Sequence, residues 1–166
     1  MKEETHTITN TYLTFRLGKE YFASNVSKVL NILEMLPITQ IPKAPEYMKG
    51  VVNLRGMVLP IIDTRIKFGM TATELTPSTG ILVLDVNIEG VSVKLGAIVD
   101  SVDEVIELGI NDIQEPPSLG VKYKSEFIEG MAKKDEGFIM ILNMDKVFSA
   151  DEILALDKIK DPSEIQ

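Results

Sequence analysis

The chain has 166 residues, of which 45% are hydrophobic and 25% are charged, as is usual for a folded globular domain. Its formal net charge of −8 disfavours binding to nucleic acid or to an anionic lipid surface. No apolar run approaches the ~18 residues of a membrane-spanning helix, and the polar N-terminus is unlike a secretory signal. We therefore expect a cytoplasmic protein that does not insert into a membrane.

The first half of the chain reads as strands with one short helical turn. Apolar residues at 13, 15 and 17 alternate with polar ones, and 21–23 return after a turn, which predicts a β-hairpin. Segment 26–33 combines helical valine spacing with β-prone residues, so we predict one helical turn that opens into a strand. Apolar residues in 51–62 predict further buried strands.

The second half continues the same pattern. Stretches rich in Val, Ile and Leu predict buried strands at 81–86, 91–99 and 138–142. Many short strands punctuated by Gly and Pro are typical of a barrel or sandwich. Ser149 and Glu152 then form a capping box, which predicts a helix over about 150–160 that ends before a proline.

The two halves of the chain resemble each other. Residues 24–32 share a polar and apolar pattern with 100–108, 47–51 with 127–131, and 56–63 with 137–143, at offsets of 76, 80 and 81 residues. A repeat of this length is too long for a solenoid unit, and it predicts two small barrels of about five strands. The first would span about 10–75 and the second about 80–147. Because each barrel has a thin core, we expect them to pack around a shared hydrophobic seam.

The sequence is poor in residues for catalysis. With no Cys and only His6, it lacks the parts of zinc, haem and nucleophile–histidine sites, and it has no Gly-rich phosphate loop. Four acids at predicted strand ends could supply the carboxylate pair of a hydrolase: Asp63, Asp85, Asp100 and Asp103. Acids at such positions more often cap turns. We therefore expect no enzyme, no metal and no cofactor.

One positive charge is not explained by the strand pattern. The segment Asn53-Leu54-Arg55-Gly56 predicts a tight turn, which accounts for the glycine but not for Arg55. A solvated arginine in a surface ion pair contributes only about 0–1 kcal/mol to stability. A partly buried guanidinium can instead organise a binding surface through bidentate hydrogen bonds. The residues alone leave both interpretations open.

Three motifs give the chain a resemblance to a known family. They are Lys49–Gly56 with the Val58, Pro60, Asp63 and Arg65 that follow, Gly96–Val102, and Phe127–Gly130. Through these motifs the chain resembles the CheW family of chemotaxis coupling proteins over about residues 11–157, nearly its whole length. The resemblance implies a single mainly β domain, 1–166, built from two five-stranded SH3-like barrels and a short C-terminal helix.

The resemblance also implies a function without catalysis. Such a protein is an adaptor between the cytoplasmic tip of methyl-accepting chemoreceptors and the regulatory domain of the chemotaxis histidine kinase, recruited to receptor arrays at the inner face of the membrane. The family's receptor contact lies in the groove between the barrels, which implies these receptor-binding residues: Val29, Asn31, Arg55, Gly56, Val102 and Val105. Kinase contacts are expected on the barrel flanks, at Ile38, Ile41 and Lys49.

One departure from the family pattern concerns the arginine in the turn. The family commonly carries a glutamate where this chain has Asn31, which can accept a hydrogen bond from the Arg55 guanidinium but offers it no charge. We therefore expect Arg55 to make a charge-assisted contact with a partner protein.

Three other functions compete with this interpretation. A CheW-like scaffold could serve a different two-component signalling pathway. A pair of oligonucleotide-binding barrels is disfavoured by the absence of Trp, the 6% aromatic content and the acidic balance. A small hydrolase with paired acids would need a substrate that the sequence does not indicate.

Overall fold

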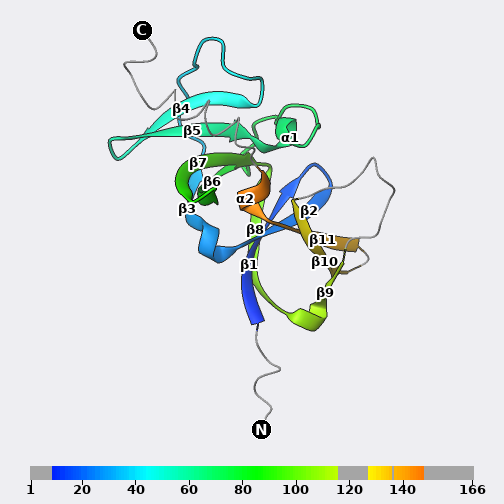
Figure 1. The fold of residues 1–166 in the computed structure, drawn as a ribbon. Helices are drawn as coiled ribbons and strands as arrows, with labels where there is room; N and C mark the ends of the chain where they lie inside the picture. Colours follow the sequence, from blue (N-terminus) through cyan, green and yellow to red (C-terminus); the bar gives the residue numbers. More distant parts are fainter. Residues whose placement is uncertain (1–8, 116–126, 136, 148–166) are drawn as a thin grey trace.

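The computed structural model describes residues 9–115, 127–135 and 137–147 (Figure 1). Strands dominate this part of the chain, which confirms the predicted mainly β fold. The predicted helix at about 150–160 lies outside the described residues. In chain order the elements are β1 (Thr9–Leu17), β2 (Glu20–Asn25), η2 (Val26–Lys28), β3 (Val29–Glu34), β4 (Met48–Leu54), β5 (Met57–Asp63), α1 (Thr64–Lys67), β6 (Gly80–Ile88), β7 (Val91–Val99), β8 (Ser101–Gly109), η3 (Ile110–Asp112), β9 (Ile113–Gln114), β10 (Ile128–Lys134), β11 (Gly137–Leu142) and α2 (Met144–Val147).

The strands form two sheets that occupy separate halves of the molecule (Figure 1). One sheet has the order β3-β6-β7-β5-β4, and an isolated bridge between Thr39 and Val51 extends it beyond β4. The other has the order β8-β1-β2-β11-β10-β9. It has one strand more than expected, because the two residues of β9 pair with β10. The predicted helical turn that opens into a strand is η2 followed by β3.

The internal repeat is visible in the hairpin that closes each half. The β4–β5 and β10–β11 hairpins are both interrupted by a register shift at the same place, before Gly50 and before Gly130. After each hairpin comes a single helical turn, α1 or α2. The backbone N–H of Asp63 donates to Tyr47 O and that of Asn143 to Phe127 O, both at 2.7 Å. The sequence similarity at offsets of 80 and 81 residues therefore reflects equivalent structure.

Each sheet takes strands from both halves of the chain. β2 runs parallel to β11, and β5 runs parallel to β7, so β1 and β2 join the later strands while β6 and β7 join the earlier ones. The two sheets consequently do not coincide with the expected subdomain ranges 10–75 and 80–147. A sequence repeat marks which segments are equivalent, but it does not distinguish pairing within a half from pairing between halves.

The largest apolar cluster lies between the two sheets. It joins residues of β1 and β2, such as Phe15 and Phe22, to residues of β6 and β7, such as Leu82 and Leu95. This cluster is the predicted shared seam. A row of four phenylalanine rings belongs to it, with successive ring centroids 6.0, 5.6 and 5.1 Å apart: Phe15, Phe22, Phe68 and Phe127. Burial of Phe15 and of Phe22 stabilises the fold by roughly 1.5–3 kcal/mol each, whereas Phe68 and Phe127 are partly buried and contribute less.

A polar link also joins the two sheets at Asp100, between β7 and β8. Its Oδ2 accepts a hydrogen bond from the backbone N–H of Gly18 at 2.6 Å and one from Nη1 of Arg65 at 3.3 Å. Its own N–H donates to the carbonyl of Arg16 at 3.0 Å. Gly18 and Arg16 come from the β1–β2 hairpin, whereas Arg65 follows β5. The carboxylate therefore fixes the orientation of one sheet relative to the other.

Candidate functional site

The four acids considered for hydrolysis serve separate local roles. Asp63 caps α1 by accepting from the N–H of Arg65, and Asp100 makes the link between the sheets. Asp85 accepts from Ser92, and Asp103 accepts from Ser101 at 3.4 Å. The described residues contain no group of three or more His, Cys, Asp or Glu arranged to hold a metal ion. These contacts support the interpretation of the acids as caps and turn residues.

Two of the residues implied for receptor binding lie at the seam. Val29, at the start of β3, and Val102, on β8, both pack against the seam cluster. A methyl group added to Gly80 would lie 3.7 Å from Cγ2 of Val102, so β8 passes close to the start of β6. β3 and β8 are each the edge strand of their sheet. The seam is therefore bordered by two edge strands, one from each sheet.

The edge strands carry exposed apolar side chains. On β3, Leu30 is 50% exposed and Ile32 is 48% exposed, while Val105 on β8 is 60% exposed. Ile32 pairs with Leu82, a fully buried seam residue, and cross-strand partners share a face of the sheet. The apolar seam surface thus continues onto the outer edge of β3. Leu30 and Ile32 were not predicted, although an apolar residue at nearly every position of an edge strand is a signal for them.

Arg55 and Gly56 form the two-residue turn between β4 and β5. Both have positive φ, +53° and +85°, and Oδ1 of Asn53 accepts from the N–H of Gly56 at 2.7 Å. The guanidinium of Arg55 is exposed and makes no hydrogen bond or ion pair with any described residue. Asn31 accepts from the N–H of Ile32 at 2.8 Å instead. Asn31 and Arg55 are therefore not bonded to each other, and their strands β3 and β4 end opposite edges of the sheet.

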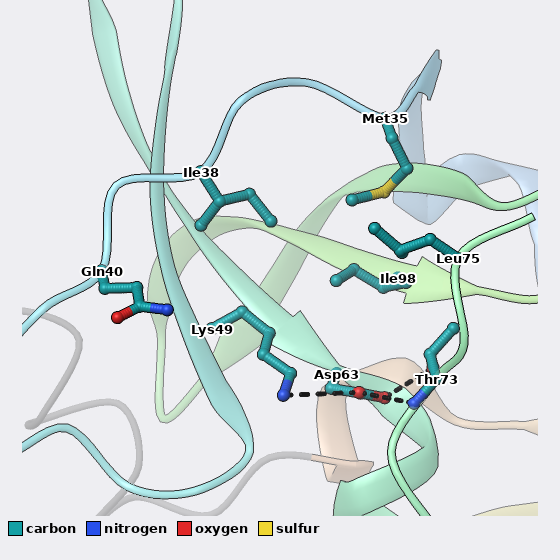
Figure 2. A pocket seen from close by; sticks show the side chains of 8 residues that line it. All are labelled: Met35, Ile38, Gln40, Lys49, Asp63, Thr73, Leu75 and Ile98. Carbon is teal, nitrogen blue, oxygen red and sulfur yellow. Dashed lines mark hydrogen bonds and ion pairs between the residues drawn. The ribbon is translucent and has the colours of Figure 1, made fainter.

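Two of the residues implied for kinase binding line one pocket, of about 240 Å³ (Figure 2). Ile38 comes from the link after β3 and Lys49 from β4, whereas Ile41 is not part of the lining. Met35 and Gln40 from that link, Asp63 and Ile98 from β5 and β7, and Thr73 and Leu75 from the segment before β6 complete the lining.

A buried carboxylate forms the polar end of this pocket. Asp63 has no exposed surface, and it accepts from the N–H of Arg65 at 3.0 Å, from the N–H of Thr73 at 3.0 Å and from its hydroxyl at 2.8 Å. Nζ of Lys49 lies 4.0 Å from Oδ2 of Asp63, and the Lys49 side chain is 37% exposed. A ligand in the pocket would therefore contact Lys49, the polar side chains of Gln40 and Thr73, and the aliphatic walls, because the carboxylate of Asp63 has no exposed surface.

Comparison with known proteins identifies the family to which this fold belongs. The fold superimposes on the crystal structure of the scaffolding protein TtCheW from Thermoanaerobacter tengcongensis with a TM-score of 0.74 and 31% identity, over 87% of this chain and 96% of that one. The CheW-like domain family matches residues 11–152. The chain belongs to the CheW-like domain family. This result confirms the resemblance found in the sequence motifs.

Curated CheW proteins match a shorter part of this CheW-like chain. Chemotaxis protein CheW of Rhizobium meliloti is 43% identical over 74 residues, which is 45% of this chain and 48% of that protein. Chemotaxis protein CheW of Klebsiella aerogenes is 37% identical over 79 residues, 48% of each chain. The matches thus span about half the length of these relatives. No helix among the described residues is long and apolar enough to cross a membrane.

Proposed function

We propose that this CheW-like chain is a non-enzymatic adaptor that couples transmembrane chemoreceptors to the chemotaxis histidine kinase. The observation that carries the proposal is the family match over residues 11–152, together with 96% coverage of a solved scaffolding protein. The relatives are chemotaxis proteins, and the four acids considered for hydrolysis each make local contacts. The adaptor would act in the cytoplasm, in receptor arrays at the inner face of the membrane.

The receptor would dock along the seam. Its cytoplasmic tip is a helical hairpin, and an amphipathic helix binds where a groove offers apolar side chains. Val29, Val102 and Val105 supply such a surface with the exposed apolar residues of β3. Asn31 would lie beside this surface on β3, whereas Arg55 and Gly56 lie on the β4–β5 turn at the other edge of the sheet. The receptor would have to extend beyond the seam for its acidic side chain to meet the unpaired Arg55 guanidinium.

The kinase would dock on the barrel flank around Ile38, Ile41 and Lys49. Ile38 and Lys49 support this placement because they share a surface pocket with aliphatic walls and a cationic group. Neither residue takes part in the seam cluster. The proposed receptor and kinase faces therefore draw on different side chains.

Calorimetric titration with the purified regulatory domain of the chemotaxis kinase from the same source tests the kinase contact. Saturable one-to-one binding is the expected result. An absence of binding at concentrations on the order of 50 μM would contradict the proposal and favour a scaffold in a different two-component pathway.

The receptor contact is tested with Val105→Asp and a matched control, Val91→Asp. Both valines are exposed strand residues, at 60% and 51%, so neither charge is buried by folding. We expect Val105→Asp to weaken binding to a receptor-tip peptide at least about tenfold, because an aspartate in an apolar groove must be desolvated. Val91→Asp, on the β6–β7 hairpin, should bind like the wild type. Equal affinities for the two variants would contradict the seam as the receptor site.

A further inference from the structure

The pocket that contains Lys49 has features that a barrel end does not need for folding. Its walls are aliphatic, from Met35, Ile38 and Ile98, and Leu75 stands at its margin with 66% of its surface exposed (Figure 2). A leucine exposed to this extent beside an open apolar pocket contributes little to the stability of the isolated protein. It becomes useful when another surface covers it.

The charge that faces the pocket is positive. Among the described residues, Asp63 accepts hydrogen bonds only from Arg65 and Thr73, and its carboxylate has no exposed surface. The side chain of Lys49 is 37% exposed and forms an ion pair with Asp63, but the Nζ–Oδ2 distance of 4.0 Å is beyond hydrogen-bond distance (Figure 2). Its three N–H groups make no hydrogen bond to any other described residue. An acceptor supplied from outside would satisfy them, and a carboxylate does so more strongly than a neutral carbonyl.

The size of the pocket indicates what it can hold. Pockets for small-molecule ligands usually measure about 300–1,000 Å³. At about 240 Å³, this pocket is closer to the volume of one or two side chains. Leu75 lines the pocket and is 66% exposed, so the apolar lining continues onto the outer surface of the protein. Both features fit a side chain that arrives on a larger protein surface better than a free metabolite.

We propose that this pocket binds a leucine or isoleucine side chain and the carboxylate of an adjacent acidic residue, both presented by a protein partner. The aliphatic side chain packs against Ile38, Ile98 and Leu75, and the carboxylate accepts hydrogen bonds from Lys49. The identity of the partner as the kinase rests on the proposed function, because Ile38 and Lys49 belong to the proposed kinase face. The ligand chemistry does not rest on it.

Two dipeptides that differ only in charge test the ligand chemistry without the kinase. They are acetyl-Leu-Glu-amide and acetyl-Leu-Gln-amide, titrated into the ¹⁵N-labelled protein and followed by ¹H–¹⁵N NMR. We expect saturable shifts of the amides of Lys49, Thr73 and Leu75 with a dissociation constant on the order of millimolar for ligands of this size. The glutamate peptide should bind about threefold more tightly than the glutamine peptide, as a partly exposed ion pair predicts.

Two variants of equal charge assign the preference to one lysine. Lys49→Met keeps the length and apolar stem of the side chain, and it should abolish the preference for glutamate while leaving weak leucine binding. Lys94→Met removes an exposed lysine of β7 that is not part of the pocket, and it should leave the preference unchanged. Equal binding of both dipeptides to the wild type, or the same loss in both variants, would overturn the proposal.

A third ligand separates a partner segment from a free acid. If N-acetyl-leucine shifts the pocket amides and acetyl-Leu-Glu-amide does not, the site takes a small carboxylic acid and the protein-partner proposal is wrong. Normal kinase binding with no dipeptide binding would overturn this inference alone. Dipeptide binding without kinase binding would instead contradict the proposed function and leave the ligand chemistry standing.

Discussion

Asp63→Asn is the substitution that tests most directly how the pocket is held together. It keeps the shape of the side chain but replaces one acceptor oxygen with an NH₂ donor. If the remaining oxygen stays with the N–H of Arg65 and the hydroxyl of Thr73, the new NH₂ group faces the N–H of Thr73, donor against donor, across 3.0 Å. The opposite amide orientation places NH₂ against the N–H of Arg65. Either way a fully buried group is left with a mismatched neighbour.

The contacts of Asp63 set the size of the effect. A hydrogen bond to a charged group contributes about 1.5–3 kcal/mol, and an unsatisfied buried donor costs about 1–3 kcal/mol. Asp63→Asn loses one of the three hydrogen bonds that Asp63 accepts, and the other two no longer involve a charged acceptor. We therefore expect the free energy of unfolding to fall by about 3 kcal/mol. For a domain of this size each kcal/mol lowers Tm by roughly 2–4 °C, which gives a decrease of roughly 6–12 °C.

Calorimetry and amide hydrogen exchange measure the two consequences separately. Besides the lower Tm, the amide of Thr73 should exchange faster in Asp63→Asn, since its acceptor is gone. Asp103→Asn is the matched control, because Asp103 is exposed and accepts only one long hydrogen bond, from Ser101 at 3.4 Å. Its Tm should change by less than about 2 °C. An Asp63→Asn protein with the wild-type Tm and unchanged exchange at Thr73 would refute the reasoning.

Three further predictions concern the barrel closure, the link between the sheets and the turn. Gly50→Ala places a Cβ in steric clash with the carbonyl oxygen of Thr39, so unfolding by denaturant should show a loss of stability above about 3 kcal/mol. Gly56→Ala should cost roughly 1–2 kcal/mol, because the space there is open and only the positive φ is strained. Equal losses in the two variants would contradict this reasoning. Asp100→Ala removes two hydrogen bonds between the sheets and should lower the free energy of unfolding by about 1–3 kcal/mol in the same denaturant measurement. An unchanged denaturation midpoint would rule this out. Arg55→Ala should shift Tm by less than about 2 °C, because the guanidinium has no partner among the described residues. The same substitution should weaken binding to a receptor-tip peptide about threefold to tenfold. A Tm many degrees lower would show that Arg55 is structural.

Local features of the fold follow closely from the sequence. The alternation at 13, 15 and 17 predicted the β1–β2 hairpin, and the valine spacing at 26–29 predicted the turn of η2 before β3. These signals depend on residues near one another in the chain. The assignment of strands to sheets depends instead on the parallel pairs β2–β11 and β5–β7, which join residues far apart. Both halves offer hydrophobic strands of the same kind, so composition does not choose between the two pairings.

The candidate site could be predicted only in part, for a similar reason. The family resemblance implied that Val29 and Val102 lie in the groove between the barrels, and both pack against the seam cluster, while their role in receptor binding stays a prediction. The pocket beside Ile38 could not be read from the sequence. The pocket forms because Thr73 donates hydrogen bonds to Asp63, ten residues earlier in the chain, and no periodic pattern in the sequence predicts that contact.

The exchange of strands between halves determines which sheets a ligand at each of the two proposed faces would contact. Because β1 and β2 lie in the sheet of the second half, the seam is made by both halves, and its borders β3 and β8 come from different sheets. The pocket near Lys49 is lined by strands of the five-stranded sheet and by the segments that follow β3 and precede β6. A ligand at the seam therefore contacts both sheets, whereas a ligand in the pocket contacts one. The two faces are connected through the seam cluster, through the chain that runs from β3 into Met35 and Ile38, and through Asp100, whose partner Arg65 follows directly on from Asp63 and Thr64. Of these connections, Asp100 belongs to neither the pocket lining nor the seam cluster, so its substitution can test communication between the faces without removing a contact of either proposed ligand.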